Sequence, residues 1–393
     1  MTVLFVSRCL PLPRYFGDRL ILAHLLAGLR ARGHRLVVAA LTQPGDAAAE
    51  RASRETCDRL ATVPERPRAA TDYLTRLIRP FPSHPAACWQ PAMWELVARL
   101  VDEEAPDVVH FLGGIQVCEY RDAAFGRPRL ITPYESHSLW LDRAVVDASG
   151  LRERLAILPR RVVVRAFERR IYRGFGRTVV LSDADARALR ALDPSLPVVV
   201  VPNGVEAPDG VAPLSVREPL VTFVGNFSYE PNRRAAHLLA ESILPKVRAT
   251  VPHARLALIG VHPPPEVGAL AGPAVEVTGE VDDVFACLQR ARVFVSPLTR
   301  GAGMKNKVLE ALAAGTPVVA TRQSLDGLAV DDGVHALPAE GPAELADAAV
   351  RVLCDDRLAR RLAIHGRRLV LRRHRWPDVV SQYERLYREL VPV

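Results

Sequence analysis

The sequence lacks an apolar run long enough to cross a membrane. Its longest apolar stretches, such as residues 36–41 and 198–201, are far shorter than the roughly 20 residues that a membrane-spanning helix needs. The first eight residues have no basic leader and no extended hydrophobic segment, so they are typical of a first strand and not of a signal peptide. These absences predict a cytoplasmic protein.

Paired cysteines are absent as well. The six cysteines are scattered without a C-x-x-C pair, which argues against a zinc site and against a disulfide framework, and no metal is expected. Aromatic residues make up only 6% of the chain, and none interleaves with the arginines as a stacking motif would. Nucleic-acid binding is therefore disfavoured, although the net charge of +8 favours anionic partners in general.

Two common nucleotide-binding motifs are missing. The turn after the first expected strand, Ser7-Arg8-Cys9-Leu10-Pro11, contains no glycine, which disfavours a nicotinamide dehydrogenase. The glycine-rich string of P-loop NTPases does not occur anywhere. Lysine is also scarce, because only Lys246, Lys305 and Lys307 occur among 52 basic residues. Two of these three lysines lie two residues apart.

What the sequence does contain is an alternation of short β-branched runs with longer stretches of helical spacing. This alternation predicts α/β architecture with parallel sheets, and 393 residues exceed the size of one usual core. A turn-rich segment at 203–219 separates two such series, so we expect domains at 1–202 and 220–375 and a final helix in 376–393. Residues 57–92 are Pro-rich and receive no assignment. Expected strands are 3–6, 36–41, 108–111, 130–132, 178–181, 198–201, 220–225, 255–259, 274–278, 293–296 and 317–321, and expected helices are 19–32, 93–104, 166–173, 183–192, 233–250, 281–291, 305–314, 342–354, 355–371 and 376–390.

The most informative segment runs from Ser296 to Thr321 and reads as strand, glycine loop, helix and strand. Gly301 and Gly303 let backbone N–H groups approach a ligand, and the positive end of the next helix points at the same place. Lys305 and Lys307 add two cations there. Cations at a helix N-terminus are unfavourable unless an anion lies between them, so the segment predicts a diphosphate site. Glu310, one turn further, is suited to accept hydrogen bonds from a ribose.

At these residues the stretch 220–390 resembles retaining GT-B glycosyltransferases of the large family 4 group. The resemblance rests on Val224-Gly225-Asn226-Phe227-Ser228-Tyr229-Glu230-Pro231-Asn232, on the run from Gly301 to Thr321, and on Asp326-Gly327-Leu328. More loosely, the N-terminal half matches through Gly17-Asp18-Arg19, Pro106-Asp107-Val108-Val109-His110 and Pro202-Asn203-Gly204-Val205.

The resemblance implies two Rossmann-like domains that face each other across a cleft. The N-terminal domain would bind the acceptor, the C-terminal domain would bind a UDP- or GDP-sugar without metal or other cofactor, and the final helix would cross back to the N-terminal domain. It also implies that Glu310 holds the donor ribose, that Lys305 and Lys307 face the diphosphate, and that Gly225 lies over the donor. The donor-binding candidates are Gly225, Asn226, Asn232, Arg233, Arg300, Gly301, Ala302, Gly303, Met304, Lys305, Lys307, Leu309 and Glu310.

The sequence departs from the family pattern at two places. Ala302 stands where the first glutamate of the family's paired-glutamate signature is expected, so backbone amides of 301–303 would replace that carboxylate at the donor sugar. Asn226 stands where an arginine is usual, and Asn232 and Arg233 stand near the usual lysine. More of the diphosphate charge would therefore fall on Lys305 and Lys307.

Catalytic candidates are Glu135 and His137 after the strand at 130–132, together with Lys305. In the family a polar pair at this strand end faces the donor sugar, although polar residues there are equally suited to cap the next helix. In the retaining mechanism that the resemblance implies, the acceptor attacks from the face that the diphosphate leaves. No protein nucleophile is then needed, and stabilisation of the leaving diphosphate is the main catalytic task.

The run from Arg152 to Arg177 carries nine arginines against two glutamates and is interleaved with apolar residues. It fits either peripheral contact with an anionic membrane, at the inner surface, or an ordinary solvated helix face. The acceptor is expected to be a glycan, a lipid-linked molecule or a small molecule. The alternatives to a glycosyltransferase are a sugar-nucleotide epimerase of the same fold and a non-catalytic protein that binds anionic ligands or nucleic acid.

Overall fold

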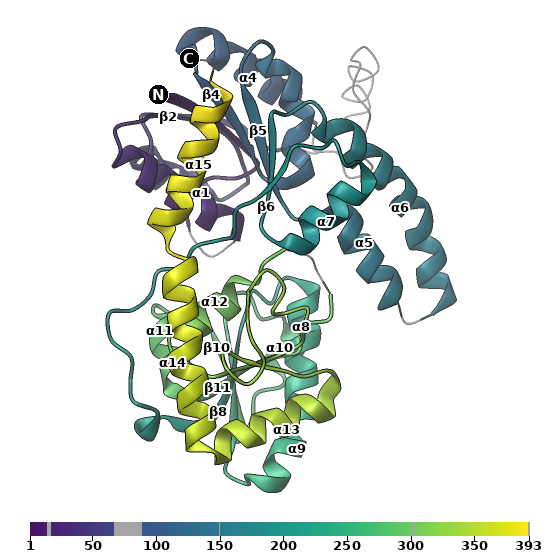
Figure 1. Cartoon of the computed structure of the whole chain (residues 1–393), viewed down its shortest axis with the longest axis vertical. Helices are drawn as coiled ribbons and strands as arrows, with labels where there is room; N and C mark the ends of the chain where they lie inside the picture. The colour runs from purple at the N-terminus through teal and green to yellow at the C-terminus, as the bar shows by residue number, and fades with distance from the viewer. Residues whose placement is uncertain (14–16, 67–88, 149, 301–302, 392–393) are drawn as a thin grey trace. The chain divides into compact units, whose positions relative to one another are not determined.

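The computed structural model describes residues 1–13, 17–66, 89–148, 150–300 and 303–391 (Figure 1). The chain forms two compact units, which are unit 1 (Met1–Pro202 with Trp376–Val393) and unit 2 (Asn203–Arg375). Each unit contains a parallel sheet with helices between its strands, so the expected α/β class with two Rossmann-like sheets is confirmed. Among the described residues, no helix combines the length and the apolar character that crossing a bilayer requires.

The seven-stranded sheet of unit 1 has the order β3-β2-β1-β4-β5-β6-β7, and all of its pairings are parallel. Strands β1 and β4 at its centre are buried almost throughout, because near-continuous apolar runs suit strands covered on both faces. The strands are β1 Thr2–Ser7, β2 Arg35–Thr42, β3 Arg59–Pro64, β4 Val108–Leu112, β5 Arg129–Tyr134, β6 Arg177–Val180 and β7 Val198–Val200. The helices are α1 Gly17–Arg30, α2 Ala47–Ser53, α4 Pro91–Glu104, α5 His137–Val146, α6 Leu151–Tyr172, α7 Asp183–Leu192 and α15 Trp376–Leu390.

The six-stranded sheet of unit 2 has the order β10-β9-β8-β11-β12-β13 and is also parallel. Its strands are β8 Glu218–Val224, β9 Arg255–Ile259, β10 Val275–Gly279, β11 Ala291–Ser296, β12 Val318–Ala320 and β13 Leu337–Pro338. The helices are α8 Glu230–His237, α9 Leu244–Thr250, α10 Pro265–Gly268, α11 Val284–Arg290, α12 Asn306–Ala313, α13 Gly341–Cys354 and α14 Asp356–Arg373.

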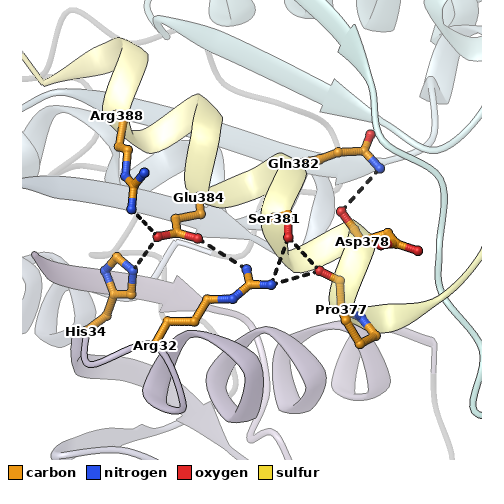
Figure 2. Close-up of polar contacts among 8 residues, drawn as sticks. All are labelled: Arg32, His34, Pro377, Asp378, Ser381, Gln382, Glu384 and Arg388. Carbon is orange, nitrogen blue, oxygen red and sulfur yellow. Dashed lines mark hydrogen bonds and ion pairs between the residues drawn. The ribbon is translucent and has the colours of Figure 1, made fainter.

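Helix α15 packs against α1 in unit 1, so the last helix belongs with the first half of the chain (Figure 1). At the exposed edge of this contact, Glu384 accepts from Arg32 and faces His34 at 3.2 Å, while Arg32 also donates to Ser381 (Figure 2). Ion pairs of this exposed kind contribute little to stability, and the buried polar contacts below them carry more weight.

A buried network fixes α15 to the sheet of unit 1. His110 of β4 lies 2.8 Å from the Tyr387 hydroxyl through Nδ1 and 2.8 Å from Thr132 through Nε2. Thr132 in turn lies 3.3 Å from the hydroxyl of Tyr383. Burial lowers the pKa of His110 to about 3, so its ring is neutral and both nitrogens are satisfied by this network.

The expected elements differ from the structure in several places, and α2, α10 and β13 have no counterpart among them. The helix expected at 166–173 is only the end of α6, which begins at Leu151, and α5 before it has no counterpart among the expected helices. Within the unassigned segment 57–92 the structure has strand β3 at Arg59–Pro64, while 67–88 lie outside the described residues. The helix expected at 233–250 is interrupted by a π-helical turn at Leu238–Ile243.

Candidate functional site

The strand order of unit 2 reverses between β8 and β11, which we call switch point 2. In open parallel sheets, ligands bind beyond the carboxyl ends of the strands at such a point, because the two connections leave in opposite directions. The loop from β8 to α8 and the loop from β11 to α12 therefore converge there. The donor-binding candidates that the structure describes lie in these loops or in the helices that follow them.

The first loop is held close to the loop after β9. Gly225 donates its N–H to the Ile259 carbonyl at 2.9 Å, and Phe227 donates to Val261 at 3.0 Å. Gly260 permits this approach, since its φ is +143° and a Cβ on it would lie 1.8 Å from the Gly225 carbonyl oxygen. A glycine is required at Gly260 for both reasons.

Asn232 connects the two loops of switch point 2. Its Nδ2 donates to the Asn226 carbonyl at 2.7 Å, and its Oδ1 accepts from the Lys307 ammonium at 2.5 Å. A Cβ on Gly225 would lie 3.0 Å from the Asn232 amide, so the first loop also passes closely over this side chain. Residues 75 positions apart in sequence thus lie in direct contact.

The second loop ends at helix α12, whose N-cap is Lys305. Gly303 has a φ of +68°, and its carbonyl accepts from the Lys305 ammonium at 2.9 Å. Asn306 at the first position of the helix accepts from the Asn203 amide at 2.7 Å. The expected helix start at 305 is therefore correct to one residue.

Lys307 lies in an environment that disfavours its charge. Burial, together with the neighbouring Lys305 charge, lowers the pKa of Lys307 to about 7, while Glu310 acts in the opposite direction. Burial raises the pKa of Glu310, and Lys307 opposes that shift. The Lys307 ammonium also lies 4.6 Å from the centre of the Phe223 ring, a cation–π contact that offsets part of the lost hydration. A bound anion would favour the charged form of Lys307.

Two arginines complete the other end of α12. Arg217 donates to the Ala314 carbonyl at 3.3 Å, and Arg367 donates to the Ala313 carbonyl. Positive charge at a helix C-terminus is favourable with the helix dipole. The arginines at the C-terminus of α12 interact favourably with the helix dipole, whereas Lys305 and Lys307 at its N-terminus interact unfavourably with it.

The remaining donor-binding candidates occupy varied positions. Arg233 donates to the carbonyls of Phe227 and Ser228 within its own loop. Arg300 is half-buried, Met304 is buried and Leu309 is fully buried in the core of unit 2. Gly301 and Ala302 lie outside the described residues, so the place of the missing family glutamate stays a prediction.

In unit 1, the catalytic candidates Glu135 and His137 lie where β5 leads into α5. Both side chains are half-buried, and the His137 ring stacks on Trp140 with 5.7 Å between ring centres. Burial lowers the pKa of His137 to about 4, with Arg160 adding to the shift, so the ring is neutral at neutral pH. Ser136 caps α5 by accepting from Leu139 at 3.2 Å. The catalytic roles of Glu135 and His137 stay predictions.

Two buried carboxylates already occupy the N-terminus of α5. Glu168 accepts the N–H groups of His137 at 2.8 Å and Ser138 at 3.1 Å, and Asp185 accepts that of Ser136 at 2.8 Å. Burial raises the pKa of Glu168 to about 7 against these hydrogen bonds. Sequence spacing does not single out either carboxylate, because each lies on a distant helix.

A pocket that the sequence reasoning missed lies at the corresponding point of unit 1, where the sheet order reverses between β1 and β4. It has a volume of about 320 Å³ and is lined by Arg8, Cys9, Asp18, Arg19, Leu41, Gln43, Asp46, Glu65 and Gln116. Arg8 pairs with Asp18 at 2.9 Å, and Arg19 pairs with Asp46 at 3.8 Å. The Gly17-Asp18-Arg19 string was the available signal. Among the described residues, no cluster of three His, Cys, Asp or Glu side chains is arranged to hold a metal ion.

Two family models match the chain. The model described as Glycosyltransferase Family 4 matches residues 21–207, and the model described as Glycosyl transferases group 1 matches residues 218–355. The phosphatidyl-myo-inositol mannosyltransferase of Mycobacterium leprae is 34% identical over 201 residues, which are 48% of this chain and 53% of that protein. The protein of the same name from Propionibacterium freudenreichii is 31% identical over 175 residues, covering 42% and 43%. The chain spans about half the length of the curated relatives it matches.

Solved structures show the same fold over nearly the whole chain. Sucrose-phosphate synthase of Thermosynechococcus elongatus has a TM-score of 0.72 at 19% identity, with 99% of each chain covered. Anabaena HepE in complex with UDP-glucose has a TM-score of 0.68 at 15% identity, with 99% of this chain and 100% of that chain covered. At these identities the likeness establishes the GT-B glycosyltransferase fold alone.

Proposed function

Because the chain belongs to the family 4 type of GT-B glycosyltransferases, we propose that it moves a hexose from a UDP- or GDP-sugar to an acceptor hydroxyl with retention of configuration. Mannosyltransferases among its relatives support a hexose as the transferred group, and UDP-glucose in a solved neighbour supports a nucleotide sugar as the donor. The observation that carries the proposal is the cation pair at the start of α12, in contact with the β8 loop.

Switch point 2 is the proposed donor site. The diphosphate would be bound by the Lys305 and Lys307 ammonium groups and by the N–H groups at the start of α12, where the helix dipole is positive. Asn232 orients Lys307 through the hydrogen bond at 2.5 Å. Glu310, one turn along the helix from Lys307, would accept the ribose hydroxyls.

The proposed chemistry needs stabilisation of negative charge more than a nucleophile. As the glycosidic bond to the diphosphate breaks, charge develops on the leaving phosphate oxygen. Lys305 and Lys307 lower the energy of that charge in a partly desolvated site, and no metal is required. The acceptor oxygen then bonds to the sugar carbon from the same face, which gives retention, and the acceptor's proton passes to the leaving phosphate oxygen.

The pocket of unit 1 is the proposed acceptor site. Its lining includes two guanidinium groups and three carboxylates, which together suit a molecule rich in hydroxyl groups, since carboxylates accept from hydroxyls and guanidiniums donate to them. An inositol or sugar headgroup has this chemistry, and the names of the relatives support a lipid-linked acceptor.

A thermal-shift panel of UDP-glucose, UDP-N-acetylglucosamine and GDP-mannose would identify the donor. With that donor, release of nucleoside diphosphate should require an acceptor, should continue in EDTA, and should be lost in Lys307→Ala. Lys246→Ala is the matched control, because Lys246 is the third lysine and is exposed on α9. Interconversion of the nucleotide sugar without acceptor would indicate an epimerase, and salt-dependent RNA binding without any donor shift would refute a sugar-nucleotide enzyme.

A further inference from the structure

Helix α6 of unit 1 has two different halves. Its C-terminal half buries Val164, Phe167 and Ile171 against the unit. The half from Leu151 to Val163 has no fully buried residue. The helix nevertheless begins well before its packed part, next to α5, as Figure 1 shows. The outward face of this half is therefore not covered by the rest of unit 1.

The exposed half presents an apolar stripe to solvent. Leu151, Leu155 and Val162 are 72%, 56% and 69% exposed, and Leu158 between them is also exposed. Their spacing of four, three and four residues places them in one row along the helix, over roughly 17 Å. At 100° per residue this row lies nearly opposite the buried row of Val164 and Ile171.

This concentration of apolar surface is unusual for the molecule. Of the twelve large hydrophobic side chains that are exposed in the described part of the chain, six fall between positions 146 and 163. They are Val146, Leu151, Leu155, Leu158, Val162 and Val163. Contiguous apolar patches rimmed by polar residues mark interaction sites. We call the row of Leu151, Leu155, Leu158 and Val162 the α6 stripe.

Positive charge surrounds the α6 stripe. Helix α6 contains seven arginines and two glutamates, one of which, Glu168, is fully buried. Arg161 and Arg165 lie against Asp142 of α5, the latter at 2.8 Å. Arg152, Arg154, Arg169 and Arg170 are exposed and form no ion pair with any residue that the structure describes.

We propose that the α6 stripe lies in the surface of an anionic lipid bilayer, with the leucines and Val162 among the upper acyl chains and the flanking arginines at the lipid phosphates. An apolar row bordered by cations has the pattern of a helix that lies in a membrane interface. A second copy of the chain would bring the same arginines together, and their repulsion opposes self-association through this face. The inference goes beyond the proposed sugar transfer, because lipid binding needs neither donor nor acceptor.

Vesicle co-sedimentation tests the proposal with two compositions, pure phosphatidylcholine and phosphatidylcholine containing phosphatidylglycerol. The whole protein should bind the anionic vesicles and release as salt rises, because screening weakens the arginine contribution. Leu155→Ser with Val162→Ser should weaken binding at least about tenfold, since each lost methylene removes roughly 0.8 kcal/mol of insertion energy. Phe125→Ser with Val216→Ser is the matched control, at 83% and 71% exposure outside the stripe, and should bind as the wild type.

A second measurement locates the contact. Val162→Trp should show a blue-shifted emission with anionic vesicles only, relative to the same chain without the substitution. Equal binding of the serine stripe variant and the control, or a Val162→Trp emission spectrum that anionic vesicles leave unchanged, would overturn the proposal. Self-association that disappears in the stripe variant would assign the face to a second copy instead. Nucleotide-sugar binding measured in the same variants reports on the proposed function separately.

Discussion

Lys307 should bind the donor diphosphate and take up a proton as it does so. Its pKa of about 7 in the free protein means that about one tenth of the molecules carry the charge at pH 8. A bound diphosphate offsets the cost of burying the Lys307 charge and returns the pKa of Lys307 towards its usual 10.5. Binding should therefore take up about 0.9 proton at pH 8 and about 0.1 proton at pH 6.

The same reasoning gives the size of the affinity change. A charge-assisted hydrogen bond contributes about 1.5–3 kcal/mol, so Lys307→Ala should weaken UDP or GDP binding by roughly 10- to 100-fold at pH 6. At pH 8 the wild type must first protonate Lys307, which costs about 1.4 kcal/mol of binding free energy. The ratio of the wild-type affinity to that of Lys307→Ala should therefore be about tenfold smaller at pH 8 than at pH 6. The sign follows because the charged form binds the anion and is lost as pH rises through 7.

Calorimetry in buffers with different ionisation enthalpies measures both quantities. Lys307→Arg is the reference, because its guanidinium stays charged throughout this pH range. Any proton uptake measured with this variant comes from the nucleotide itself and can be subtracted. Lys246→Ala controls for general loss of lysine charge. Equal proton uptake at pH 6 and pH 8 in the wild type, or the same uptake at pH 8 in Lys307→Arg, would refute the assignment of the titrating group.

Three further outcomes are expected. Glu310→Gln should raise the donor KM with little change in the folded structure, and an unaltered KM would contradict a ribose contact. The pKa of Glu168 is raised to about 7 in the folded protein, so its neutral form is the favoured one. As the pH rises from about 4.5 to 7, the wild type should therefore lose on the order of 3 kcal/mol of unfolding free energy that Glu168→Gln does not lose. Parallel pH profiles of unfolding free energy in the two proteins would exclude this. Gly260→Ala should destabilise unit 2 by at least about 2 kcal/mol through its clash with the Gly225 carbonyl, whereas Gly268→Ala, with open space around its Cα, should unfold as the wild type does in denaturant.

The sequence is sufficient to predict most of the sheet structure because the central strands are continuous β-branched runs. Strands β1, β2 and β4 match the expected ranges within one or two residues of their ends, since burial on both faces leaves few polar residues inside them. The start of helix α6 at Leu151 is not predictable in this way, because its first half has no fully buried residue and its apolar row is the exposed one. Pro159 inside it also argues against a helix.

The site is predictable only where the chain supplies its parts consecutively. Gly303 and the two lysines that follow it lie within a few residues of one another, so local geometry is enough to place these three together. The contact of Lys307 in α12 with Asn232 in α8 depends on the strand order of the sheet, which residue spacing does not contain. The pocket of unit 1 is not predictable from the sequence, because the turn that contains Arg8 carries no recognisable motif. The other residues that line the pocket come from separate segments of the chain.

The return of α15 to unit 1 has a consequence for biosynthesis. When residues 1–202 emerge from the ribosome, Tyr387 and Tyr383, the hydrogen-bond partners of His110 and Thr132, have not yet been made. The face of α1 that packs against α15 is also uncovered at that stage. At about 5–20 residues per second, the roughly 170 residues of unit 2 take about 9–35 s to translate before those partners are made. Unit 2 can fold as soon as its own segment has emerged, whereas the half that was made first is the last to be completed.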